Sequence, residues 1–172
     1  MPVRYLLVSV NSMANTSPLI ENLAVCSWSL QPDDTTDLVS MIQSLGLSKI
    51  QLALNDHRGS AGGAAIGIAL AKADIEIVSG MFGTVGEDYS SMEAIKLTGG
   101  VVPDETWEAN QEIARDVVET ARSLGLDLVS FHAGFLPEAP DDPDYDKLIK
   151  RLRTVAKLFD DSGIQLSFET GQ

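Results

Sequence analysis

The sequence has little cysteine, little positive charge and no long apolar run, and each shortage excludes a class of protein. A single cysteine, Cys26, cannot form an intrachain disulfide, which favours a reducing compartment. Twelve Lys and Arg against 25 Asp and Glu give a net charge of −13, so nucleic acid and anionic membranes would repel the protein. No segment approaches the ~18 consecutive apolar residues of a membrane span. We therefore expect a cytoplasmic protein that binds neither nucleic acid nor membrane.

The N-terminal segment, MPVRYLLVSVNSMANTSPLIEN, superficially looks like a signal peptide. Its apolar run is shorter than the usual ~7–15 residues, and no small-residue cleavage site follows closely. We predict that residues 1–20 form a disordered extension and that residues 21–172 belong to a single domain.

The remaining sequence alternates between two periodicities. Helical spacing of apolar residues is clearest in residues 107–124 and 145–162, and glycine follows three of the helices, at residues 46, 125 and 163. Short apolar segments that are typical of strands fill the intervals, at residues 23–28, 47–54, 75–80, 126–134 and 164–171. The predicted order is strand–helix repeated, with five strands and four helices. Strands joined through helices run parallel, with right-handed crossovers.

Two folds fit this order, an open doubly wound sheet and a (β/α)₈ barrel. No strand is followed by G-x-G-x-x-G or by G-x-x-x-x-G-K-[ST], the phosphate-binding signals of nucleotide folds. The glycine-rich residues 55–63 match neither spacing and predict a flexible loop before a helix of small residues. The sequence therefore favours an α/β TIM barrel, of which the first five strands and four helices are present.

The fourth and fifth strands each present a polar face that ends in a chemically useful residue. Ser130 and His132 share one face of the fourth strand, and Ser167 and Glu169 share one face of the fifth. His132 and Glu169 are then at matched positions about 5 Å apart, at the carboxyl ends where TIM barrels carry their chemistry. They could bind a divalent metal or act as hydrogen-bond donor and general base. A structural hydrogen bond for His132 and a solvated cap for Glu169 are the alternatives.

Four short runs resemble the sugar phosphate isomerase/epimerase family, whose xylose isomerase-like TIM barrel is shared with endonuclease IV. These runs are AVCSWSL, MFGTVGEDY, VSFHAG and LSFETGQ, and the resemblance covers about residues 20–172. It implies a divalent metal (Mn, Mg, Co or Zn) held by the glutamate that ends the fifth strand, here Glu169, with the other ligands beyond residue 172. It also implies that His132 lies beside the metal and contacts substrate, and that Trp28 lines the pocket. A packed core position is the alternative for Trp28.

The third loop, residues 81–102, is longer than a plain connection and predicts a lid or a binding loop. Glu87 and Tyr89 lie in it, together with a short helix around residues 92–97. Both side chains could contact sugar hydroxyls, and simple solvation is the alternative.

These observations predict a metal-dependent isomerase or epimerase of sugars or sugar phosphates. It would act by transferring the proton that is bound to the carbon alpha to a carbonyl. Glu169 would serve as metal ligand and acid/base, and His132 would assist. A whole barrel needs about 250 residues, so we expect the chain to be truncated and inactive alone. One alternative is a non-catalytic half-barrel that binds a partner or forms homo-oligomers. An endonuclease IV-like nuclease is disfavoured because only two histidines occur and the charge is −13.

Overall fold

The structure, a computed structural model, describes residues 20–137 and 139–171. The extension predicted for residues 1–20 lies outside the described residues, apart from Ile20, which begins a short 3₁₀ helix, Ile20–Asn22. The domain limits at that end of the chain therefore stay a prediction.

The element order agrees with the predicted alternation. The strands are β1 (Val25–Cys26), β2 (Lys49–Ala53), β3 (Glu76–Phe82), β4 (Leu128–Phe135) and β5 (Gln165–Gly171). The helices are α1 (Ser27–Leu30), α2 (Thr35–Ser44), α3 (Gly59–Lys72), α4 (Met92–Thr98), α5 (Trp107–Leu124) and α6 (Tyr145–Asp160), with a 3₁₀ helix at Asn55–His57. The glycines that follow α2, α5 and α6 have φ of 68°, 67° and 71°, the left-handed conformation expected of a helix C-terminus.

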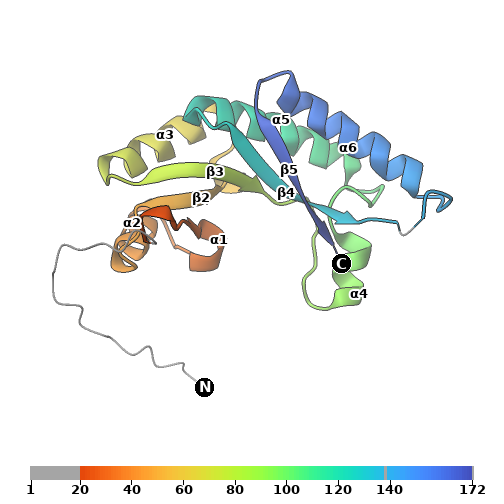
Figure 1. Cartoon of the computed structure of the whole chain (residues 1–172), viewed down its shortest axis with the longest axis horizontal. Coiled ribbons are helices and arrows are strands. Elements are labelled where there is room, and N and C mark those ends of the chain that lie inside the picture. The colour runs from red at the N-terminus through yellow and green to blue at the C-terminus, as the bar shows by residue number, and fades with distance from the viewer. Residues whose placement is uncertain (1–19, 138, 172) are drawn as a thin grey trace.

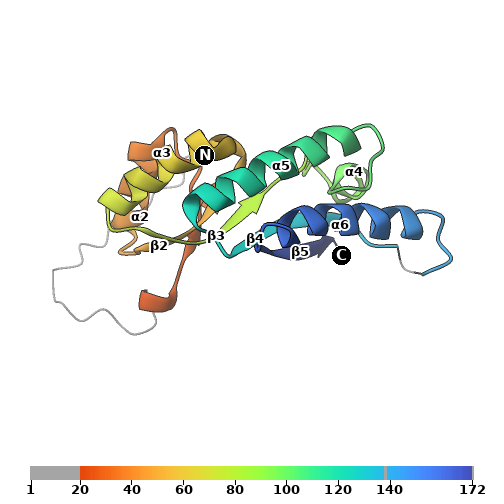
Figure 2. The same cartoon turned by 90° about the horizontal axis from the view of Figure 1, so that it is seen from above.

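All five strands are parallel and neighbour one another in chain order, β1-β2-β3-β4-β5. Helices α3, α5 and α6 lie together along one side of this twisted sheet, and both views show them as a single layer (Figures 1 and 2). The described residues thus form five of the eight strands of a TIM barrel. The predicted fold class, an incomplete barrel, is confirmed.

The core lies between the sheet and this helical layer. Its centre is a stack of three rings, in which the Phe82 centroid is 4.8 Å from that of Phe131 and 6.0 Å from that of Phe159. Helix α5 adds Ala114 and Val117, which recur at helical spacing and are fully buried. On β5, Phe168 stays 40% exposed, because within the described residues this strand pairs only with β4.

Two local predictions are wrong. The first strand is only two residues long, because the chain turns into α1 at Ser27. The Ser27 hydroxyl accepts a hydrogen bond from Ala53 N at 2.8 Å, so that a side chain replaces the ladder bond that a longer strand would make. Trp28 consequently lies on a helix and not on a strand.

The glycine-rich residues 55–63 do not form a long flexible loop, since α3 begins at Gly59. Gly62 and Gly63 lie inside this helix, where they allow close packing. A Cβ at Gly62 would come within 2.7 Å of the His57 carbonyl oxygen, and one at Gly63 would overlap the Ser123 hydroxyl on α5. Close approach of helices, not loop flexibility, explains these glycines.

Among the residues that the structure describes, no helix is both long enough and apolar enough to cross a membrane.

Candidate functional site

A pocket of about 570 Å³ opens at the carboxyl ends of β3, β4 and β5. Its walls come from helix α1, the end of β3, the loop that follows it, and the last residues of β4 and β5. All five residues singled out in the sequence line this pocket: Trp28, Glu87, Tyr89, His132 and Glu169. The structure therefore brings together side chains that are as far apart in sequence as residues 28 and 169.

His132 and Glu169 are partners in the register of β4 and β5, as the period-two pattern predicts. The two side chains differ in burial, since His132 is 8% exposed whereas Glu169 is exposed. Within the described part of the chain, the Glu169 side chain makes no hydrogen bond and no ion pair. Its carboxylate is consequently available to a ligand that enters the pocket.

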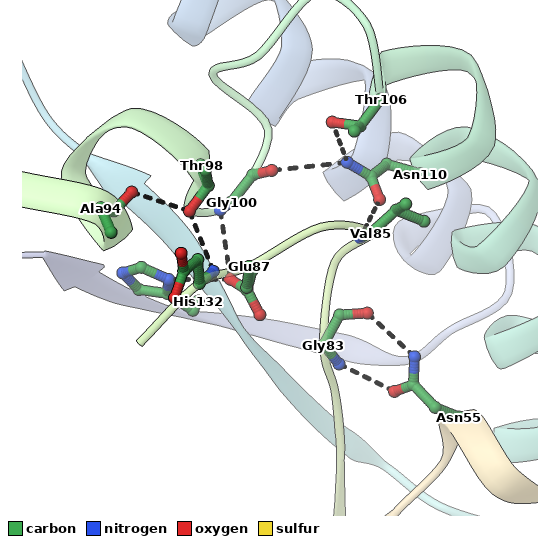
Figure 3. Close-up of polar contacts among 11 residues, drawn as sticks. Asn55, Gly83, Val85, Glu87, Ala94, Thr98, Gly100, Thr106, Asn110 and His132 are labelled. Carbon is green, nitrogen blue, oxygen red and sulfur yellow. Dashed lines mark hydrogen bonds and ion pairs between the residues drawn. The ribbon is translucent and has the colours of Figure 1, made fainter. Parts of the chain in front are cut away.

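The partner of His132 is Glu87, which the sequence did not connect with it. His132 Nδ1 lies 2.9 Å from Glu87 Oε1, and the two side chains are only 10% and 9% exposed. Glu87 Oε1 also accepts a hydrogen bond from Gly100 N at 3.2 Å. Figure 3 shows the carboxylate between the imidazole ring and the backbone at Gly100. Glu87 is therefore neither a solvated loop residue nor a freely mobile one.

Tyr89 lies on the same side of the pocket, with its ring centroid 6.4 Å from that of His132. Although 69% of the Tyr89 surface is exposed, desolvation of the phenol at the pocket wall raises its pKa to about 12, and the negative charges of Glu87 and Glu169 act in the same direction. The phenol is therefore protonated, and able to donate a hydrogen bond, throughout the physiological pH range.

Two asparagines fasten the loop that carries Glu87 and Tyr89. Asn55 exchanges two hydrogen bonds with the backbone of Gly83, at 2.9 and 2.8 Å. Asn110, 2% exposed, accepts from Val85 N at 2.8 Å and donates to the Gly100 carbonyl at 3.4 Å. One amide thus joins both ends of the loop (Figure 3).

Arg151 of α6 fastens the next stretch of the same connection. Its Nη1 donates to the carbonyls of residues 101, 102 and 103 at 3.0, 2.7 and 3.2 Å, and Nη2 pairs with Asp104. The guanidinium also lies over the Trp107 ring, 5.1 Å from its centroid. The connection between β3 and α5 is therefore anchored by side chains of other elements, and its residues 83, 84, 86, 87 and 89 form one wall of the pocket.

Sequence reasoning missed Asn55, Asn110 and Arg151. One signal was present for Asn110, because it occupies a position in the buried stripe of α5, four residues before Ala114. A polar residue at a core position needs a hydrogen-bond partner, and the nearest backbone without regular structure is the loop.

The described residues supply part of a metal site but not a whole one. Among them, no group of three or more His, Cys, Asp and Glu side chains could hold a metal ion. Glu169 offers an unpaired carboxylate, which suits a hard divalent cation, and His132 is its neighbour in the register. In the same wall the Thr84 hydroxyl is buried and has no hydrogen-bond partner among the described residues. A bound polar group or a water molecule could satisfy it.

Comparisons with known proteins agree with this architecture. A family model described as a xylose isomerase-like TIM barrel matches residues 28–171. The chain is similar to a xylose isomerase domain protein from Planctomyces limnophilus, at 24% identity and a TM-score of 0.71, over 78% of this chain and 49% of that one.

Two other solved structures share the fold at lower identity. One is 3-keto-D-glucoside 4-epimerase from E. coli, at 11% identity and a TM-score of 0.59, over 84% of this chain and 54% of that one. The other is a xylose isomerase-like TIM barrel protein from Mycobacterium smegmatis in complex with magnesium. It has 16% identity and a TM-score of 0.59, over 85% of this chain and 54% of that one. The chain spans about half the length of these structures. Among curated proteins, none matches this sequence.

Proposed function

Because this chain belongs to the xylose isomerase-like TIM barrel family, we propose that it supplies the first five strands of a metal-dependent sugar isomerase or epimerase. The observation that carries the proposal is the pairing of His132 with Glu169 at the carboxyl ends of adjacent strands, inside one pocket. The names of two similar structures, an epimerase and a magnesium complex, support this kind of chemistry.

Glu169 is the proposed acid/base. Its exposed carboxylate lines the pocket and has no hydrogen-bond partner within the described residues, so it is free to approach a proton of a bound sugar. It would take the proton from the carbon alpha to the carbonyl of the sugar. A proton would then be delivered either to the neighbouring carbon by Glu169, or to the opposite face of the same carbon by a second acid/base from the further strands of the barrel. The two outcomes are isomerisation and epimerisation.

His132 would hold a sugar oxygen beside Glu169, and two aromatic side chains would form the walls around the ring. Trp28 and Tyr89 both line the pocket, where their faces can pack on the apolar C–H surface of a sugar. None of the lining residues is Lys or Arg, and two are carboxylates. A neutral sugar therefore suits this wall better than an anionic one, and a phosphate group would need partners outside it.

A divalent cation, when bound, would polarise the sugar oxygens and stabilise the negative charge that develops as the proton leaves. Glu169 is the residue of this chain that would hold it, with His132 alongside. The remaining ligands would come from further strands of the barrel.

Deuterium exchange tests the proposal directly. A form of the protein that carries all eight strands is incubated in D₂O with Mn²⁺ or Mg²⁺ and a panel of aldoses and ketoses. We expect deuterium to enter at C1, C2 or C3 of at least one sugar, and we expect E169Q and chelator-treated samples to incorporate none. Absence of exchange across the panel, in folded protein with metal present, would refute the function.

A further inference from the structure

One oxygen atom connects the site histidine to the loop. Glu87 Oε1 lies 2.9 Å from His132 Nδ1 and 3.2 Å from Gly100 N. The Gly100 amide can only donate, so Oε1 acts as an acceptor in this arrangement. A carboxylate that accepts from the imidazole requires the proton to be on Nδ1. In the neutral ring, the other nitrogen, Nε2, then carries the lone pair.

The other ring nitrogen, Nε2, has no hydrogen-bond partner among the described residues, although the ring lines the pocket. Tyr89 and Phe135 lie near the ring, each with a centroid 6.4 Å from that of the imidazole. The lone pair that remains available is therefore the one on Nε2.

The backbone at residues 99–100 leaves no room for rearrangement. A Cβ at Gly99 would come within 2.8 Å of His132 Cε1. Gly100 has φ of +68°, and a Cβ there would overlap the Ala133 backbone on β4. Val101 N donates to the Ala133 carbonyl at 3.2 Å, which holds this turn against the strand.

We propose that Glu87 is a positioning residue: it fixes His132 in the Nδ1–H tautomer and presents Nε2 to the pocket as a hydrogen-bond acceptor. A hydrogen-bonded carboxylate behind a functional imidazole is a general way to set the tautomer and the orientation of the ring. In the proposed isomerase, on which this role rests, Nε2 would accept the proton of a sugar hydroxyl and hold that oxygen beside Glu169. The tautomer itself does not depend on the reaction.

The chain suits a direct measurement, because it contains only two histidines, His57 and His132. Long-range ¹H–¹⁵N correlation of the ¹⁵N-labelled chain, at a mildly alkaline pH where imidazole is neutral, distinguishes Nδ1–H from Nε2–H. The variant H57Q assigns the remaining pattern to His132. We expect the Nδ1–H pattern in the wild-type chain.

Three variants separate positioning from a general effect on folding. E87A should convert the His132 pattern towards Nε2–H, the form that free imidazole prefers. E87Q keeps the accepting oxygen, so it should retain Nδ1–H, with the Nδ1 proton shifted upfield because a neutral amide is a weaker acceptor. E93A removes an exposed carboxylate from the same loop with the same change in net charge, and it should leave the pattern unchanged.

Several results would overturn the inference: an Nε2–H or doubly protonated ring in the wild-type chain, an unchanged pattern in folded E87A, or an unmoved Nδ1 proton in E87Q. If E87A does not fold, the wild-type and E87Q spectra decide. The spectra require no substrate and no metal. Failure of the deuterium-exchange assay with the expected spectra would therefore reject the isomerase and leave the role of Glu87 in holding the ring intact.

Discussion

Replacing Asn110 with alanine should destabilise the chain by about 2 kcal/mol. The variant loses the 2.8 Å bond to Val85 N, which contributes about 1 kcal/mol. It also leaves the Gly100 carbonyl without its buried donor, at a further cost of about 1–2 kcal/mol. Alanine is the better helix former by about 0.5 kcal/mol, which offsets part of this loss in α5.

Urea unfolding, followed by far-UV circular dichroism, measures this change. At a slope of about 2 kcal/mol/M, the midpoint should fall by about 1 M. Amide hydrogen exchange gives the local readout, because Val85 N should lose protection before the amides of β4. Both results follow if Asn110 joins the two ends of the loop.

The matched control is Q111A, the neighbouring residue on the same helix. Gln111 also carries a side-chain amide, but within the described residues this amide forms no hydrogen bond. Its truncation should change the stability by less than about 0.5 kcal/mol. If N110A behaves like Q111A in both measurements, the loop is held by other contacts and the reasoning about Asn110 is wrong.

Three further outcomes can be measured. R151A should lower the free energy of unfolding in urea by about 2 kcal/mol, because the carbonyls of residues 101–103 lose their donor. The control is K150A, at an exposed neighbouring position on α6, and equal midpoints for the two variants would contradict the expectation. Tyr89, whose pKa is raised to about 12, should ionise later in the folded chain than in the unfolded chain, so the stability should fall as the pH rises from ~10 to about 12. Ultraviolet titration of wild type against Y89F isolates this ionisation, and a Tyr89 midpoint near pH ~10 would refute the expectation. E169Q, in a protein with all eight strands, should lower kcat at least ~10²-fold and weaken Mn²⁺ binding in calorimetry, with the fold unchanged. Tight Mn²⁺ binding by the 172-residue chain alone would mean that the metal has been placed wrongly.

The sequence by itself determined the order of strands and helices and the end of the sheet at which the site lies. Alternation of helical and strand periodicity requires parallel strands, and a period of two residues places alternate side chains on one face. His132 and Glu169 therefore had to meet if their strands were neighbours, and the register confirms that they do. The sequence also favoured a TIM barrel over an open doubly wound sheet, and both the resemblance and the family model support that choice.

The tertiary structure alone decided how that site is held. The contacts of Glu87 with His132, Asn110 with Val85 and Asn55 with Gly83 join residues 45, 25 and 28 positions apart. Each involves a segment without periodic structure, where no repeat tells which face a side chain occupies. Which oxygen lies within hydrogen-bond distance of which nitrogen is settled only after the sheet and helices have packed, because the packing brings the loop against the end of β4. The same reason shortened the first strand, where the hydroxyl of Ser27 on one segment found the amide of Ala53 on another.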